Sequence, residues 1–172
     1  MGEIAAAQAG KPARLIFKMN QLEEDTLIQR LYLASQAGVK VDLIVRGLCC
    51  LRPGLEGVSE NIRVISTVGR FLEHSRIYYF QNAPDDQQLY LGSADLMRRN
   101  LYNRVEILFP VLEPRLRLRI MRILGTTLAD NQSSWELRSD GAYYRQPPKV
   151  DTAPLEAQQV FMNNSFGLEI LP

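Results

Sequence analysis

The sequence has little histidine, cysteine and lysine, and it has no long hydrophobic run. No stretch of 18 uncharged apolar residues occurs, which excludes a membrane-spanning helix. The first residues, MGEIAAAQAGKPA, lack a basic segment and a long apolar stretch, so we do not expect a secretory signal there. The two cysteines, Cys49 and Cys50, are adjacent. Neighbouring cysteines rarely form a structural disulfide, so a reduced, cytoplasmic compartment is expected.

Net charge is also small. The 20 basic and 19 acidic residues leave a net charge of +1, which disfavours nucleic acid or any other polyanion bound through bulk charge. Only four of the basic residues are lysines: Lys11, Lys18, Lys40 and Lys149. The planar guanidinium of arginine suits bidentate contact with phosphate or carboxylate. An arginine bias also arises in GC-rich genomes, so composition alone does not decide between these explanations.

The hydrophobic pattern predicts an α/β fold. RLIFKM (14–19) and VKVDLIVRG (39–47) are typical of buried strands, and the amphipathic segment between them, 22–38, is typical of a helix. A strand, a helix and a strand within about 35 residues form a βαβ unit with a right-handed crossover.

The rest of the chain continues this alternation. We expect a first helix that ends at Gly10 and a basic helix that starts at Pro114, since the first turn of a helix tolerates proline. The segment 133–145 predicts a hairpin around Asp140-Gly141. Further strands are expected at 61–67, 76–80, 88–93 and 104–111, and a last helix at 153–164. Without repeats or linkers, residues 1–172 are expected to form one domain with a mixed, mostly parallel sheet flanked by helices.

Arg46 is the first candidate for a functional residue. It follows the second predicted strand directly and precedes Gly47, which frees the backbone. In open α/β sheets, ligands bind outside the carboxyl ends of the strands. The alternative is an ordinary exposed arginine that ends a strand.

The single histidine is the second candidate. His74-Ser75-Arg76 stands before a predicted strand, and Gly92-Ser93-Ala94-Asp95 follows later. This arrangement resembles the H-x-K…G-S-x-N signature of the phospholipase D superfamily, with arginine in place of lysine and aspartate in place of asparagine. In that chemistry an imidazole acts on a phosphoryl group as nucleophile or general acid, and a small Gly-Ser turn brings backbone donors close to the anion. A structural histidine is the alternative.

Longer strings carry a more specific resemblance. FKMNQL, GVKVDLIVRGLCCLRPG, SENIRVISTVGRFLEHSRIYYF, GSADLMRRNL and RVEILFPV, in this order, resemble the carboxyl-terminal region of bacterial polyphosphate kinase. The resemblance runs from about residue 3 to about residue 166 of the chain. It implies the second of two phospholipase D-like α/β domains that face each other across an active site. The family transfers the terminal phosphate of ATP reversibly to inorganic polyphosphate, through a phosphohistidine and with Mg²⁺.

Three residues of this chain match functional positions of the family. The resemblance implies that His74 contacts the nucleotide phosphates and acts as general acid or base opposite the nucleophile. It also implies that Arg46 binds the ATP phosphates and that Arg104 lies near the triphosphate, although Asn103 stands where a second basic or aromatic residue is common. The arginines of the helix from 114 to 124 are expected to face solvent, with a polyphosphate path along them as the alternative. Cys49 and Cys50 are expected to pack a turn.

Other parts of the site are expected outside this chain. The resemblance places the phosphorylated histidine, the Mg²⁺ ligands and a tyrosine that contacts ATP or ADP in the first phospholipase D-like domain of the full-length kinase. It implies a homo-oligomer when intact, in the cytoplasm or associated with a membrane surface. Two functions stay open: half of a phosphotransferase active site, or a non-catalytic module of the same fold that binds phosphate or polyphosphate.

Overall fold

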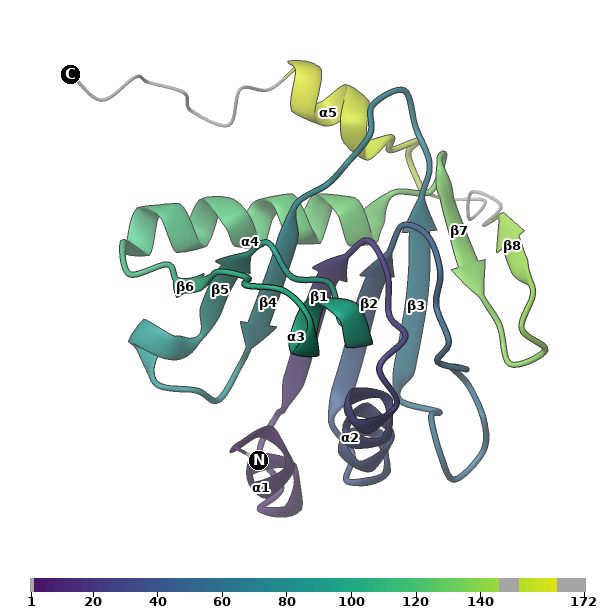
Figure 1. Ribbon diagram of the computed structural model, residues 1–172. Helices are drawn as coiled ribbons and strands as arrows, with labels where there is room; N and C mark the ends of the chain where they lie inside the picture. Colours follow the sequence, from purple (N-terminus) through teal and green to yellow (C-terminus); the bar gives the residue numbers. More distant parts are fainter. Residues whose placement is uncertain (1, 146–151, 164–172) are drawn as a thin grey trace.

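The computed structural model of the chain describes residues 2–145 and 152–163. Within them, eight strands form one sheet in the order β6-β5-β4-β1-β2-β3-β7-β8 (Figure 1). The strands are β1 (Arg14–Met19), β2 (Lys40–Val45), β3 (Ile62–Thr67), β4 (Arg76–Phe80), β5 (Leu89–Gly92), β6 (Leu108–Pro110), β7 (Ser134–Leu137) and β8 (Tyr143–Arg145). The helices are α1 (Gly2–Gln8), α2 (Asp25–Gln36), α3 (Arg98–Tyr102), α4 (Pro114–Ala129) and α5 (Ala157–Asn163), with a 3₁₀ turn, η1, at Asp85–Gln87.

The sheet is mixed, as predicted, but the expectation that it is mostly parallel is wrong. Among the described strands only β1–β2 and β2–β3 pair in parallel. The other neighbouring pairs are antiparallel. The expectation failed because a continuous apolar run reports burial of both faces of a strand, not its direction. In β4 the run RIYYF is buried or half-buried throughout although it is antiparallel to both of its neighbours.

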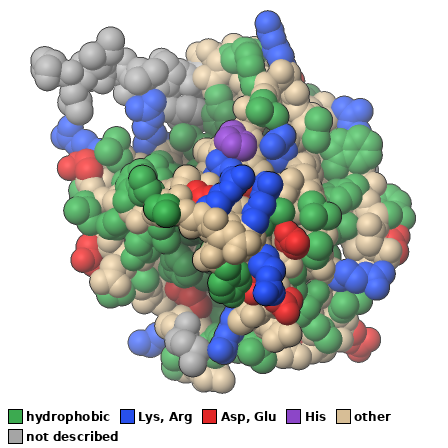
Figure 2. Space-filling view, in the orientation of Figure 1, with side chains coloured by type: hydrophobic (Ala, Val, Ile, Leu, Met, Phe, Trp, Pro, Cys, Tyr) green, Lys and Arg blue, Asp and Glu red, His purple; other side chains and the backbone are tan. Residues whose placement is uncertain are grey.

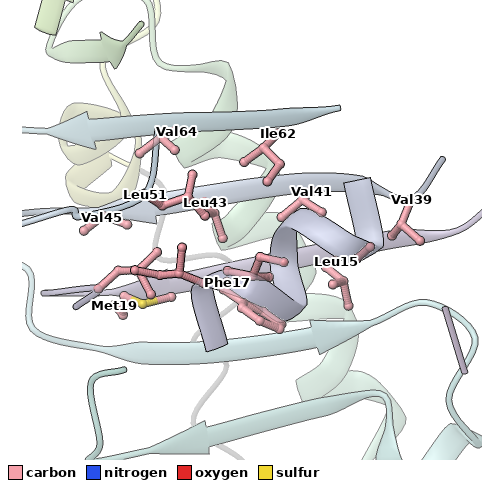
Figure 3. Packing of buried hydrophobic residues seen from close by; sticks show 14 of the residues in the cluster. Leu15, Phe17, Met19, Val39, Val41, Leu43, Val45, Leu51, Ile62 and Val64 are labelled. Carbon is pink, nitrogen blue, oxygen red and sulfur yellow. The ribbon is translucent and has the colours of Figure 1, made fainter. Parts of the chain in front are cut away.

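Side chains that alternate along each strand divide the core into two layers. One layer packs against α1 and α2 and includes Leu15, Phe17 and Met19 of β1 (Figure 3). The intervening Ile16 packs with Ile44 of β2 on the opposite face, which α4 covers. The helices therefore flank the sheet on both sides, as the α/β pattern predicts.

Helix and hairpin ends follow local chemistry. The predicted helix 22–38 begins at Asp25 because the Glu24 carboxylate caps it, accepting the Leu27 N–H at 2.7 Å. After α2, Gly38 adopts a φ of 89°, a left-handed conformation that glycine permits. The hairpin between β7 and β8 is confirmed, with Gly141 at a φ of 84° in its turn. The predicted last helix is confirmed over Ala157–Asn163, and residue 164 lies outside the described residues.

One segment was assigned wrongly. The predicted strand 104–111 is reduced to β6, Leu108–Pro110, and the short helix α3 before it was not predicted. Apolar side chains in 104–111 predicted pairing along the whole run. The segment before β6 is instead held by side chains, because Glu106 accepts hydrogen bonds from Ser93 and Asn100.

None of the helices in residues 2–145 and 152–163 has both the length and the apolar character needed to cross a membrane.

Leu43 tests the packing of the central strand. Its side chain is fully buried in β2, so Leu43→Ala is expected to lower the free energy of unfolding by about 2–5 kcal/mol, through lost burial and a residual cavity. Urea denaturation of the 172-residue chain measures this. Leu33→Ala is the matched control, since Leu33 lies on α2 with 47% of its surface exposed, and a change within about 0.5 kcal/mol is expected there. Equal losses in the two variants would contradict the assigned core.

Candidate functional site

Four polar residues gather at one edge of the sheet. Asn20 and Arg46 follow the carboxyl ends of the parallel strands β1 and β2. His74 precedes β4, which runs antiparallel to β1, so the start of β4 lies at the same edge. Asp95 follows β5, which reverses direction again and returns there. The two antiparallel strands thus bring the halves of the histidine motif to the strand ends where ligands bind in α/β sheets.

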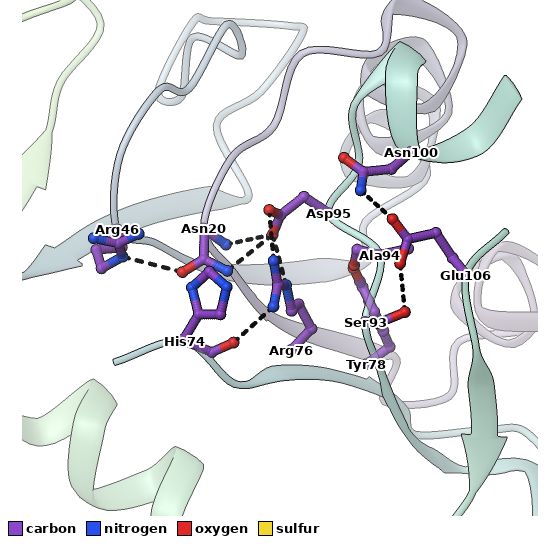
Figure 4. A network of polar contacts seen from close by, with 10 residues as sticks. All are labelled: Asn20, Arg46, His74, Arg76, Tyr78, Ser93, Ala94, Asp95, Asn100 and Glu106. Atoms are coloured by element: carbon purple, nitrogen blue, oxygen red, sulfur yellow. Dashed lines mark hydrogen bonds and ion pairs between the residues drawn. The ribbon is translucent and has the colours of Figure 1, made fainter. Parts of the chain in front are cut away.

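Hydrogen bonds connect these residues into one network (Figure 4). The Nε of Arg46 donates to Oδ1 of Asn20 at 3.0 Å. Asn20 donates to Oδ1 of Asp95 from its backbone N–H at 2.7 Å and from Nδ2 at 3.2 Å. Arg76 donates to both oxygens of Asp95, at 3.2 and 3.1 Å, and its Nη1 donates to the backbone carbonyl of His74 at 3.0 Å. The sequence-predicted residues Arg46 and His74 therefore belong to the same network.

Asp95 stays ionised at the centre of this network. Burial raises the pKa of its carboxyl, but the hydrogen bonds and charge of Arg76 and the donors of Asn20 outweigh burial, so the pKa lies below its usual value. Arg76 donates its guanidinium N–H groups to Asp95 and to the His74 carbonyl. Arg76 is thus positioned to orient the histidine rather than to bind a ligand.

Arg46 and His74 keep their reactive groups available. Arg46 is half-buried, and among the described residues only its Nε has a hydrogen-bond partner, so both terminal nitrogens can receive an anion. His74 is exposed, and no described residue hydrogen-bonds its imidazole ring. In Figure 2 the histidine lies at the surface with Lys and Arg side chains beside it. An exposed imidazole next to guanidinium groups suits a phosphate-bearing ligand.

The Gly-Ser turn has a role different from the one predicted. The Ser93 N–H donates to the Ile107 carbonyl at 3.0 Å, so it does not reach out to an anion. The Ser93 hydroxyl donates to Glu106 and accepts from the Ile107 N–H. A Cβ at Gly92 would lie 2.8 Å from the Ile107 oxygen. Glycine and serine at these positions therefore join β5 to the segment before β6.

Arg104 lies apart from the hydrogen-bonded network. It is exposed, in the connection between α3 and β6, and it lines a pocket of about 1080 Å³ with mostly apolar walls. Neither Arg46 nor His74 lines this pocket. The link between Arg104 and the network is electrostatic. Hydrogen bonds from Ser93 and Asn100 are the main cause that lowers the pKa of Glu106, and the charges of Arg104 and Arg76 lower it further.

Lys18 is a residue that the sequence pattern concealed. It lies in β1 and is only 4% exposed. The apolar residues around it predict a buried strand and give no sign of a separate role for the lysine. Its Nζ forms an ion pair with Glu73 at 3.0 Å and donates to the Ser75 hydroxyl at 2.9 Å. Lys18 therefore holds the side chains on both sides of His74. A basic residue inside an apolar strand was the signal that could have identified it.

The described residues do not form a site for Mg²⁺. No group of three or more His, Cys, Asp or Glu side chains able to hold a metal occurs in residues 2–145 and 152–163. The carboxylates of Asp95 and Glu106 already accept hydrogen bonds from protein donors on both oxygens. Mg²⁺ prefers carboxylate and water oxygens in an octahedral arrangement, which these groups do not offer.

Of the two cysteines, Cys49 packs as expected, whereas Cys50 is exposed. Both are free thiols. Cys49 packs against the layer that faces α2, and burial raises the pKa of its thiol to about 11. A protonated, half-buried thiol is a poor nucleophile, so Cys49 has no role in the chemistry of this edge.

Comparisons with known proteins agree on the family. The family described as "Polyphosphate kinase C-terminal domain 2" matches residues 1–158. Polyphosphate kinase from Synechocystis is 53% identical over 152 residues, which are 88% of this chain and 21% of that protein. Polyphosphate kinase from Burkholderia cenocepacia is 58% identical over 145 residues, 84% of this chain and 21% of that protein. The chain thus spans about a fifth of the length of these relatives.

Solved structures agree on the fold. The crystal structure of polyphosphate kinase from Porphyromonas gingivalis superposes with a TM-score of 0.89 and 42% identity, over 96% of this chain and 25% of that one. A phospholipase D family member, Nuc from Salmonella typhimurium, superposes with a TM-score of 0.55 at 11% identity, over 79% of this chain and 89% of that one. The second likeness concerns the fold alone. With the family match, these findings show that the chain belongs to the polyphosphate kinase family, to its C-terminal domain 2.

Proposed function

We propose that this chain provides one half of the active site of an ATP:polyphosphate phosphotransferase. One observation carries the proposal. Arg46, whose terminal nitrogens have no hydrogen-bond partner among the described residues, and His74, with an exposed ring, belong to one hydrogen-bonded network at the edge of the sheet where β1 and β2 end. The relatives that the chain resembles are named polyphosphate kinases.

The two residues have different roles in this proposal. Arg46 binds the phosphates of ATP or ADP, because its terminal nitrogens can form a bidentate contact with phosphate oxygens. His74 acts as general acid or base: a ring nitrogen transfers a proton to or from the oxygen whose bond to phosphorus breaks or forms. Arg104 adds positive charge near the triphosphate. Inorganic polyphosphate is the second substrate.

The remaining parts of the reaction lie outside this chain in our proposal. These are the phosphorylated histidine, the Mg²⁺ ligands and the other domains of the kinase, whose intact form is a cytoplasmic homo-oligomer. Magnesium supplies charge neutralisation on the phosphates when bound. Residues 1–172 then act as one domain that closes the site from one side.

The chain by itself is expected to make no polyphosphate. Covalent catalysis needs its nucleophile, and the sole histidine of the chain, His74, matches the acid–base position. Incubation with radiolabelled ATP and Mg²⁺ should therefore give neither polymer nor a phosphorylated protein. A stable phosphohistidine at His74 would show that this residue is the nucleophile and that the proposed division of roles is wrong.

Substitutions in the whole kinase separate the roles of His74 and Arg46. His74→Ala is expected to lower turnover about 10²- to 10⁴-fold with a small effect on ATP binding, because a general acid acts on charge that develops in the transition state. Arg46→Ala is expected to weaken ATP binding and turnover together, since a charge-assisted hydrogen bond worth about 1.5–3 kcal/mol is lost in both states.

Steady-state kinetics and a separate ATP-binding measurement decide between the outcomes. Arg138→Ala is the control, because Arg138 is an exposed arginine after β7, outside both the network and the pocket that Arg104 lines. If His74→Ala weakened ATP binding and left turnover intact, His74 would be an anion ligand, and the non-catalytic phosphate-binding module would be the better description.

A further inference from the structure

The loop between β3 and β4, residues 68–75, carries His74 and lies against helix α5 (Figure 1). Most of its residues are exposed, so burial of its own side chains does little to fix it. The position of the imidazole therefore depends on what holds the backbone of this loop. Three side chains from outside the loop do so: Arg76 at its end, Lys18 from β1 and Gln158 from α5.

Gln158 holds the middle of the loop through hydrogen bonds of its side-chain amide. Its Oε1 accepts the Phe71 N–H at 2.8 Å, and its Nε2 donates to the Phe71 carbonyl at 2.8 Å. The same Nε2 donates to the Glu73 carboxylate at 3.1 Å. The glutamine thus pairs with one backbone unit as a neighbouring strand would, although it is 4% exposed and 87 residues away in sequence. A buried amide with both ends satisfied is a rigid support.

Gly69 makes room for this contact. A Cβ built on Gly69 would lie 2.4 Å from Oε1 and 2.7 Å from Cδ of Gln158. Any larger residue would push the amide away from Phe71. Glycine at position 69 of the loop therefore leaves the space that the side chain of Gln158 in α5 occupies.

Glu73 joins this support to the sheet. One of its oxygens accepts from Gln158, and the other forms the ion pair with Lys18 at 3.0 Å. Lys18 also holds the Ser75 hydroxyl. His74 lies between Glu73 and Ser75 in the chain, so both of its neighbours are held by buried groups while its own ring stays exposed.

Helix α5 is itself fixed in place by Asp130, which follows α4 and is buried. Its Oδ2 accepts the Ala157 N–H at 2.8 Å and the Ser133 hydroxyl at 2.7 Å. Its Oδ1 accepts the N–H groups of Gln132 and Ser133. The support of Gln158 is therefore anchored to α4 and not to a free helix.

We infer that Gln158 is a positioning residue for His74: through Phe71 and Glu73 it holds the loop 68–75 in the conformation in which the imidazole faces the phosphates. The catalytic part of this inference rests on the proposed function. The structural part, that α5 fixes the environment of the imidazole, does not.

The single imidazole allows a direct test on the 172-residue chain. In Gln158→Ala, the ring signals of His74 in ¹H–¹³C NMR spectra should shift and broaden through exchange between loop conformations. In Gln159→Ala they should stay as in the parent, because Gln159 is exposed on the same helix and bonds only to Asn163 among the described residues. Unchanged His74 signals in a folded Gln158→Ala chain would overturn the inference, whatever the kinase activity.

Gln158→Glu keeps the shape of the side chain and guards against a variant that fails to fold. The carboxylate can still accept the Phe71 N–H, but its second oxygen would face the Phe71 carbonyl and the Glu73 carboxylate instead of donating to them. The His74 signals should change in this variant too. Circular dichroism and urea midpoints establish that each variant is folded, and signals like those of the parent in Gln158→Glu would count against the inference.

Kinetics in the whole kinase test the catalytic part. Gln158→Ala should lower kcat about 10- to 100-fold, the cost of a misplaced catalytic group, with KM for ATP changed less than about threefold. Gly69→Ala should have a similar effect, because its methyl displaces the amide. The double variant should lose no more than Gln158→Ala alone, whereas two independent structural losses would add.

The outcomes distinguish the two proposals. If His74→Ala leaves turnover intact, the proposed acid–base function fails, and the NMR result still decides whether α5 holds the loop. If His74→Ala lowers turnover but Gln158→Ala and Gln159→Ala both leave kcat unchanged, the proposed function stands and the positioning role of Gln158 fails.

Discussion

The buried carboxylate of Asp95 is the interaction on which the candidate site depends. A single ionised group, 3% exposed, accepts hydrogen bonds from the end of β1 and from the start of β4. An unpaired buried charge is costly, so the carboxylate is stable there only while Asn20 and Arg76 donate to it. These two residues in turn orient Arg46 and the His74 backbone. The buried Asp95 carboxylate thus holds together the segments that follow β1, β2 and β5 and the segment that precedes β4.

Lys18 is a second buried charged residue that positions neighbouring segments. Its ammonium is buried on the face of the sheet that α4 covers, and its stability requires Glu73 and Ser75 nearby. Asp95 and Lys18 therefore hold the histidine loop from two sides with opposite charges. Because the buried groups satisfy one another, the Arg46 terminal nitrogens and the His74 ring have no hydrogen-bond partner in the part of the chain that the structure describes. This separation between supporting and ligand-facing side chains is common in preorganised sites.

The sequence predicted the elements of this site better than their arrangement. Short apolar runs bounded by turn residues predicted β1, β2, β3 and β4, because both signals lie within a few residues of the strand itself. Strand direction was misjudged beyond β3, because an apolar run records burial on both faces and nothing about which neighbour a strand pairs with. His74 and Arg46 were identifiable as the lone imidazole of a known motif and as an arginine at a strand end. Gln158 was not, because its function depends on a contact with Phe71 that no local pattern encodes.

The contact between Phe71 and Gln158 also sets the order in which the site can form during synthesis. Domains fold as the chain leaves the ribosome, at about 5–20 residues per second, and 87 residues separate the two partners. The strands that carry Asn20, Arg46 and Asp95 are complete well before α5 is made. The histidine loop therefore spends several seconds without this support, and the contact that holds Phe71 forms only once α5 has been made.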